Sequence, residues 1–305
     1  NSTRLLIADV DQDSSALEVL LRDSRVTRLG EGVDASGSLA EAAIARVEQV
    51  LSAYREQIEL HDCEANMAVL TSAVRDAANG ADFAARVRDT YGLDARVLSG
   101  DEEAQLTFLG AMSGHAGTPG DDADTDTQTV VIDIGGGSTE FVVGSANTAG
   151  FHTSLHVGVV RMSERHIHSD PPEPNELQDL AADVRQNFET GLPRHERDVV
   201  QRAIAVAGTA TSAAAMDQEL DPYDPERVNG YTLTLGTVEM LLARLADMDE
   251  GKRRNVVGLH PDRAPTIVAG MIVLSEAMRA FALDQVKVSE HDILYGGALR
   301  LAGIG

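Results

Sequence analysis

The chain has 305 residues, 43% of them hydrophobic, which is typical of a globular protein with one large domain or two ordinary ones. Its formal net charge of −24 repels polyanions over long range, so we expect neither nucleic acid nor an anionic membrane as a partner. The single cysteine, Cys63, excludes an internal disulfide, and no signal peptide pattern opens the chain. These features predict a cytoplasmic protein.

The first 100 residues alternate short apolar runs with helical patterns, which is typical of an α/β layout. Ser38 followed by Glu41 is a candidate capping box for a helix. The apolar face of that helix would carry Leu39, Ala43, Val47, Val50 and Tyr54. Strands are expected at Leu5–Val10, Met67–Leu70 and Arg96–Leu98, and a further helix over Phe83–Thr90.

The second part of the chain follows residues 114–128, which have no periodicity and predict a linker or exposed loop. Strands are expected beyond it at Thr129–Ile134, Phe141–Gly144, Ala203–Ala207 and Val286–Ser289. Helices are expected over Thr209–Glu219, Thr237–Met248 and Thr266–Leu283, with a helical tail from Ile293. The apolar stretch 264–283 contains Glu276 and Arg279, which favours a buried core helix over a membrane span.

One short pattern occurs twice, at Ser2–Ala8 and at Ser138–Gly144: Ser-Thr, a charged residue, three large apolar residues and a small residue. Seven matching positions can arise by chance, but two similar domains that each open with a β-hairpin is the more specific interpretation. On that hypothesis the chain begins in the middle of a hairpin. A sheet without its inner strand would expose unpaired backbone groups, so we expect the natural protein to extend upstream by roughly one strand and a turn.

The strongest motif lies between two predicted strands, from Asp133 to Glu140. Its turn consists of Gly135, Gly136, Gly137 and Ser138. Glycines let backbone N–H groups turn inward and approach an anion closely. The two carboxylates flank this turn, where their oxygens would hold Mg²⁺ directly or through water. The alternative is a plain hairpin turn with incidental acids.

A second candidate phosphate loop follows the strand at Ala203–Ala207. Gly208, Thr209 and Thr211 lead from that strand into a helix, a geometry that aims N–H and hydroxyl groups at a phosphate. The alternative is a threonine that serves as the N-cap of the helix.

Two charged segments complete the candidate residues. Glu102 and Glu103 stand in the first turn of a helix that Gly100 opens, where acids usually complement the helix dipole. Arg75 lies just past the strand at Met67–Leu70. The sequence has no zinc-ligand spacing and no nucleophile elbow.

Taken together and in order, these segments resemble the Ppx/GppA family of exopolyphosphatases and guanosine pentaphosphate phosphatases. The resemblance covers essentially the whole chain. Besides the motifs above and Asn1-Ser2-x-Arg4-Leu5, it rests on Arg28-Leu29-Gly30-Glu31-Gly32, Thr71-Ser72-Ala73-x-Arg75-Asp76-Ala77, Ser99-Gly100-x-Glu102-Glu103-Ala104, Leu155-x-Val157-Gly158-x-Val160-Arg161 and Val288-Ser289-Glu290-x-Asp292-Ile293-Leu294.

The resemblance implies an α/β fold similar to that of actin, Hsp70 and the sugar kinases, with two ribonuclease-H-like domains flanking an interdomain cleft. Domain I would span residues 1–120 and about 291–305, without its first strand, and domain II residues 121–290. Asp133, Glu140, Thr209 and Glu103 would then line the cleft.

The resemblance also implies roles for single residues. Glu103 matches the general base that activates water, Arg75 a catalytic, phosphate-contacting arginine, and Asp133 with Glu140 the acidic pair that positions Mg²⁺, or Mn²⁺ in its place. The phosphate-binding positions would be Ser2, Arg75, Gly135, Gly136, Gly137, Ser138, Gly208, Thr209 and Thr211. The chain departs from the family at the absent opening Asp-x-Gly-Ser/Thr motif, at Gln105, where arginine is common, and at Asn229, where histidine is frequent.

The expected function is that of an exopolyphosphatase, which releases the terminal phosphate of inorganic polyphosphate stepwise or processively. The alternatives are a guanosine pentaphosphate phosphohydrolase, an actin-like-fold kinase or ATPase, and a catalytically silent nucleotide sensor. The absence of Trp and the 4% aromatic content favour polyphosphate, because no aromatic pair is available to hold a base. Arg75 and Arg161 would mark where the polymer enters, and a homodimer is compatible with the sequence.

Overall fold

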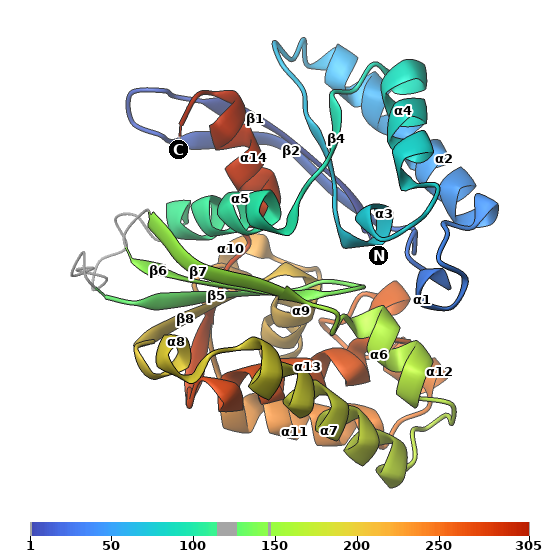
Figure 1. Cartoon of the computed structure of the whole chain (residues 1–305), viewed down its shortest axis with the longest axis vertical. Coiled ribbons are helices and arrows are strands. Elements are labelled where there is room, and N and C mark those ends of the chain that lie inside the picture. Colours follow the sequence, from blue (N-terminus) through green and yellow to red (C-terminus); the bar gives the residue numbers. More distant parts are fainter. Residues whose placement is uncertain (1, 115–126, 146–147, 305) are drawn as a thin grey trace. The chain divides into compact units, whose positions relative to one another are not determined.

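The computed structural model describes residues 2–114, 127–145 and 148–304 (Figure 1). The chain forms two compact units, Asn1–Gly110 with Ile293–Gly305, and Ala111–Asp292. The predicted linker at 114–128 lies mostly outside the described residues. Across the described ranges, no helix combines the length and the apolar character needed to cross a membrane.

The first unit carries two separate two-stranded sheets. β1 (Ser2–Val10) pairs antiparallel with β2 (Leu17–Val26), and β3 (Ala68–Leu70) pairs parallel with β4 (Ala95–Val97). The three strands expected in this part are confirmed. β2 was not predicted, because its charged residues interrupt the alternation by which a half-buried strand is recognised.

The helices of the first unit are α1 (Val33–Ser36), α2 (Glu41–Leu60), α3 (Ser72–Arg75), α4 (Gly80–Tyr91), α5 (Gly100–Ser113, whose last residues belong to the second unit) and α14 (Ile293–Leu301). The capping box at Ser38 is wrong: α2 has Ala40 as its N-cap, and Ser38 donates its backbone N–H to Ser36 Oγ instead. The predicted apolar face of α2 is largely confirmed, since Ala43, Val47 and Tyr54 are buried.

Helix α14 joins the first unit through a close glycine contact with α5. A Cβ on Gly296 would lie 1.8 Å from the carbonyl oxygen of Leu106, so only glycine allows this approach. Leu98, Leu106 and Ile293 form a small core beside the contact. The tail of the chain therefore packs on the helix that carries Glu103.

The second unit is built on one six-stranded sheet in the order β7-β6-β5-β8-β10-β9. Its strands are β5 (Thr129–Ile134), β6 (Thr139–Ser145), β7 (Thr148–Leu155), β8 (Arg202–Val206), β9 (Thr232–Thr234) and β10 (Gln285–Val288). β5, β8 and β10 are parallel, whereas β6, β7 and β9 run antiparallel to their neighbours. The predicted strands are confirmed, while β7 and β9 were not predicted.

Helices cover this sheet, and Figure 1 shows α7, α11 and α13 together on one side of it. The helices of the unit are α6 (Val159–His166), α7 (Pro174–Gly191), α8 (Arg194–Asp198), α9 (Ala207–Asp217), α10 (Pro225–Val228), α11 (Leu235–Ala246), α12 (Glu250–Arg253) and α13 (Ile267–Ala280), with a 3-10 turn at Pro261–Arg263.

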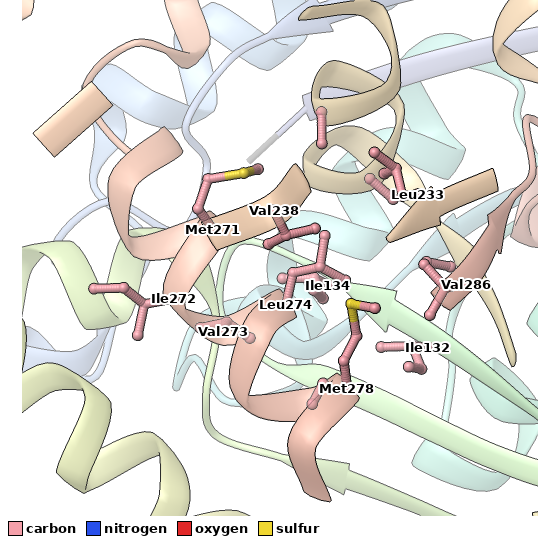
Figure 2. Close-up of a cluster of buried hydrophobic side chains, with 14 of the residues drawn as sticks. Ile132, Ile134, Leu233, Val238, Met271, Ile272, Val273, Leu274, Met278 and Val286 are labelled. Atoms are coloured by element: carbon pink, nitrogen blue, oxygen red, sulfur yellow. The ribbon is translucent and has the colours of Figure 1, made fainter. Parts of the chain in front are cut away.

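Helix α13 is the centre of the apolar core, and every residue from Ile267 to Met278 is buried. Figure 2 shows Leu274 and Met278 of this helix near Ile134 and Ile132 of β5, in the same apolar core. This burial confirms that the apolar stretch is a core helix.

The repeat inferred from the two Ser-Thr patterns is present at the level of strand pairing. β1 with β2 and β6 with β7 are consecutive antiparallel pairs, and β3 with β4 and β8 with β10 are parallel pairs. In the second unit β5 joins its two pairs into one sheet. In the described part of the first unit the two pairs remain separate sheets.

Candidate functional site

The first turn of α5 holds two adjacent glutamates in different environments. Glu102 Oε2 accepts the backbone N–H and the hydroxyl of Ser99, at 2.9 and 2.8 Å, and Ser99 Oγ accepts the N–H of Glu102. This reciprocal pair is a capping box, and the N–H of Ser99 lowers the pKa of Glu102. Glu102 therefore has a helix-capping role, whereas the side chain of Glu103 is only 8% exposed.

Glu103 forms an ion pair with Arg75. Arg75 Nη1 donates to Glu103 Oε2 at 2.8 Å and to the carbonyl of Leu98 at 2.9 Å. Burial raises the pKa of Glu103 above its usual range, and the negative charge of Asp76 raises it further. The hydrogen bond and charge of Arg75 lower the pKa, as does the charge of Arg4, but burial is the largest effect. A carboxylate whose pKa is raised in this way is a stronger base than an exposed one.

In the second unit, three side chains form a row across neighbouring strands. Asp133 on β5 is the register partner of Glu140 on β6, and Glu140 is the partner of Ser154 on β7. Direct partners project from the same face of a sheet. Glu140 is buried, and its Oε1 accepts hydrogen bonds from Ser138 Oγ at 2.5 Å and Ser154 Oγ at 2.7 Å.

The glycine turn between β5 and β6 is held from one side by α6. The N–H of Gly135 donates to the carbonyl of Ser138 at 2.9 Å, and the carbonyl of Gly135 accepts the N–H of Val159 at 3.0 Å. The structure shows no partner among the described residues for the N–H groups of Gly136, Gly137 and Ser138. N–H groups presented by a turn in this way are suited to bind an anion.

Gly158, just before α6, packs directly on this turn. A Cβ at this position would lie 2.3 Å from the carbonyl oxygen of Gly136 and 2.3 Å from the carbonyl carbon of Gly137. Thr139 Oγ1 also donates to the carbonyl of Val157 at 2.5 Å, which ties β6 to the same segment. Arg161 follows in the first turn of α6, with its N–H directed at the carbonyl of Gly136.

The second predicted loop connects β8 to α9 through a strained residue. Ala207 has a φ of 65°, in the left-handed region that non-glycine residues rarely adopt. Val206 is the N-cap, so Thr209 and Thr211 lie inside the helix and the N-cap alternative is wrong. Arg263 Nη1 donates to the carbonyl of Gly208 at 2.7 Å and thereby braces the loop.

Arg263 was missed by the sequence analysis. The same Nη1 also donates to Ser212 Oγ at 2.8 Å, across 51 positions of the chain. An arginine in a short turn before an apolar helix carries no local signal for this long-range contact. Tyr223, whose hydroxyl donates to the buried carboxylate of Glu290, was missed in the same way.

The candidate polar residues of the second unit lie at the carboxyl ends of the parallel strands β5, β8 and β10. Asp133 stands next to Val206 in the register of β5 and β8, and Ser289 donates its N–H to the carbonyl of Ala205. The glycine turn, the loop at Gly208 and the segment after β10 therefore occupy one edge of the sheet. Open α/β sheets bind ligands at this carboxyl edge.

The structure thus brings the predicted residues together in two sets. Arg75 and Glu103 form the set of the first unit, and Asp133, Glu140, Gly135–Ser138 and Gly208–Thr211 form the set of the second. Ser2 starts β1, as the register partner of Val26, and belongs to neither set. That both sets line one cleft stays a prediction.

The residues of the second set fit Mg²⁺ bound together with a phosphate. Within the described ranges, no group of three or more His, Cys, Asp or Glu side chains is arranged to hold a metal. Mg²⁺ is usually held by one or two carboxylates, with waters and substrate phosphates completing its shell. Asp133 and Glu140 supply that number of carboxylates beside the glycine turn.

Turns that present N–H groups at the ends of parallel strands, beside paired carboxylates, define a phosphate-binding α/β protein. The model of the Ppx/GppA phosphatase family matches residues 6–300, and the chain belongs to this family. It is 38% identical over 316 residues to exopolyphosphatase 2 of Mycobacterium tuberculosis, covering 99% of this chain and 96% of the relative. It is 29% identical over 304 residues to exopolyphosphatase 1 of the same species, covering 98% and 85%.

Solved structures agree with this membership. A crystal structure of an exopolyphosphatase-like protein has a TM-score of 0.91 at 30% identity, covering 99% of this chain and 94% of that one. The Ppx/GppA family member of Aquifex aeolicus has a TM-score of 0.79 at 27% identity, covering 98% and 94%. The fold class expected from the sequence is therefore confirmed.

Proposed function

We propose that this chain is an exopolyphosphatase, which hydrolyses the terminal phosphoanhydride bond of inorganic polyphosphate. Family membership and the names of its relatives support the reaction class. The observation that carries the mechanism is the buried Glu103, paired with Arg75 at 2.8 Å and with a raised pKa. The carboxylate of Glu102, one residue earlier, accepts the two hydrogen bonds of a capping box and is therefore not a candidate for the base.

In the proposed reaction, water attacks the terminal phosphorus and Glu103 accepts its proton. A P–O bond forms to the water oxygen, the bridging P–O bond breaks, and the shortened chain leaves with the electron pair. No phosphoenzyme intermediate forms in this scheme, because the group that attacks the phosphorus is water held by a base. Glu103 then returns its proton to solvent or to the leaving chain.

Arg75 orients this base and binds phosphate. Both of its hydrogen bonds use Nη1, and within the described residues Nε and Nη2 have no protein partner. A guanidinium carries five N–H donors, so those that remain can bind phosphate oxygens in a forked geometry. One contact to Glu103 and another to phosphate would hold the base beside the reacting centre.

The second unit would bind the phosphate chain through its two turns. The N–H groups of Gly136, Gly137 and Ser138 and the start of α9 at Gly208 are the donors. Asp133 and Glu140 would hold Mg²⁺, which when bound neutralises charge on the phosphate oxygens. These carboxylates repel a phosphate chain without the cation, so substrate binding should require it.

Phosphate release measured side by side from polyphosphate of defined length, guanosine pentaphosphate and ATP tests this function. We expect the highest kcat/KM for polyphosphate. A higher value for guanosine pentaphosphate would reverse the substrate assignment, and a higher value for ATP would favour the kinase or ATPase alternative. Glu140→Gln should lose most activity on every substrate, and unchanged activity in that variant would refute the role of the carboxylate pair.

A further inference from the structure

Ser154 is the second-last residue of β7, outside every motif that the sequence analysis singled out. It is the register partner of Glu140 on the neighbouring strand β6, and its hydroxyl donates to Glu140 Oε1 at 2.7 Å. Ser138, from the glycine turn, donates to the same oxygen at 2.5 Å. One oxygen of a buried carboxylate therefore accepts two hydroxyl groups from two different segments of the chain.

This arrangement fixes the orientation of Glu140. Hydroxyl-to-carboxylate hydrogen bonds of this length are the strong, charge-assisted kind. The hydroxyl of Ser138 comes from the glycine turn, which has to accommodate a ligand, whereas Ser154 lies in a strand that pairs with β6 on both sides of Glu140. Ser154 is thus the partner whose position is set by the sheet.

We propose that Ser154 is a positioning residue for Glu140: it holds Oε1 and thereby sets the direction in which the carboxylate faces the bound cation. This inference rests on the proposed role of Asp133 and Glu140. Hydrogen-bond partners behind a metal ligand fix its orientation and strongly affect metal affinity. The row Asp133–Glu140–Ser154 then combines two ligands and one support on adjacent strands.

The test is Mn²⁺ binding to the whole chain, measured by electron paramagnetic resonance with inorganic phosphate present, alongside KM and kcat for polyphosphate. Ser154→Ala should raise the Mn²⁺ dissociation constant about 10-fold. Ser154→Thr keeps a hydroxyl and suits a strand, so it should restore the affinity. Thr153→Ala is the matched control, because the neighbouring residue projects from the opposite face of β7 and should leave the affinity unchanged.

The outcomes separate this inference from the function on which it rests. Glu140→Gln should lose Mn²⁺ affinity, and an unchanged affinity in that variant would refute the carboxylate pair as the cation site and the role of Ser154 with it. If Glu140→Gln loses affinity but Ser154→Ala does not, only the positioning role is overturned. A loss in Ser154→Ala that Ser154→Thr does not restore would also overturn it, since the hydroxyl would not be the group that acts.

Discussion

Replacement of the buried carboxylate Glu103 by glutamine separates its proposed catalytic role from its effect on stability. Glu103→Gln keeps the size of the side chain and an oxygen that can accept the hydrogen bond of Arg75, but it removes the proton acceptor. General base catalysis contributes about 10²–10⁴-fold to a rate, so we expect kcat to fall by that factor. KM for polyphosphate should change little, because the phosphate-binding groups are retained.

Glu103→Gln should lower kcat, but it should make the folded chain more stable relative to the unmutated chain as the pH rises. Burial raises the pKa of Glu103 in the folded chain, so the unfolded chain releases this proton at a lower pH than the folded chain does. The free energy of unfolding therefore loses this contribution as the pH rises from below about 4.3 through the folded-state pKa. Each tenfold rise in proton affinity corresponds to about 1.4 kcal/mol. Glutamine does not ionise, so Glu103→Gln does not lose unfolding free energy in this way. The stability of this variant relative to the unmutated chain should therefore improve between pH 4 and pH 7.

The assay combines steady-state phosphate release with urea unfolding at several pH values. On the acid side, kcat/KM should fall as the pH drops through a pKa above the usual value of about 4.3, because only the ionised carboxylate accepts a proton. Glu102→Gln is the control and should keep turnover within a few-fold, since glutamine also serves in a capping box. Turnover in Glu103→Gln like that of the unmutated chain would refute the assignment, and a relative stability that worsens with pH would refute the burial argument.

Three further predictions concern packing and the cation. Gly158→Ala places a methyl group 2.3 Å from the carbonyl oxygen of Gly136, so it should cost about 1–3 kcal/mol of unfolding free energy and most of the activity, measured by urea unfolding and phosphate release. The control Gly236→Ala, where the nearest atom is 3.9 Å from the new carbon, should be neutral or stabilising; equal effects would contradict the packing argument. Gly296→Ala should push α14 away from α5, because the carbonyl oxygen of Leu106 on α5 would lie 1.8 Å from the new carbon, and it should lower both kcat and the thermal midpoint; an unchanged kcat would show that α14 does not position the base. Chelation should abolish phosphate release and added Mg²⁺ or Mn²⁺ should restore it, whereas release that persists in chelator would contradict the cation requirement.

Much of the fold could be predicted from the sequence because its core elements carry strong periodic signals. β5 and β8 are short apolar runs, and α13 is apolar on all sides, which identifies a buried helix. β2 and β7 were missed because half-exposed strands with charged or small residues lack a clean alternation. The start of α2 was misplaced because a capping box pattern at Ser38 competes with other local hydrogen bonds of serine.

The parts of the candidate site that could be predicted are those whose residues are adjacent in the sequence. The turn from Gly135 to Ser138 combines glycines with flanking strands, and such a motif is readable without a structure. Ser154 and Arg263 act through register and long-range contacts, which no local pattern encodes. The resemblance singled out Glu103, but the capping box of Glu102 and the burial of Glu103 became visible only in the structure.

Helix α13 has a consequence for both phosphate turns. Gly270 on this helix lies so close to its neighbours that a Cβ would be 2.9 Å from Thr209 Oγ1 and 3.3 Å from Val159 Cγ1. Thr209 belongs to the loop after β8, and Val159 belongs to the helix that holds the glycine turn. Helix α13 therefore packs closely behind both turns, while the pairing of β5 with β8 spaces the strands that end in them. Under the proposed function, bulk added at Gly270 would press on both turns at once, so it would alter phosphate binding without changing a charged group.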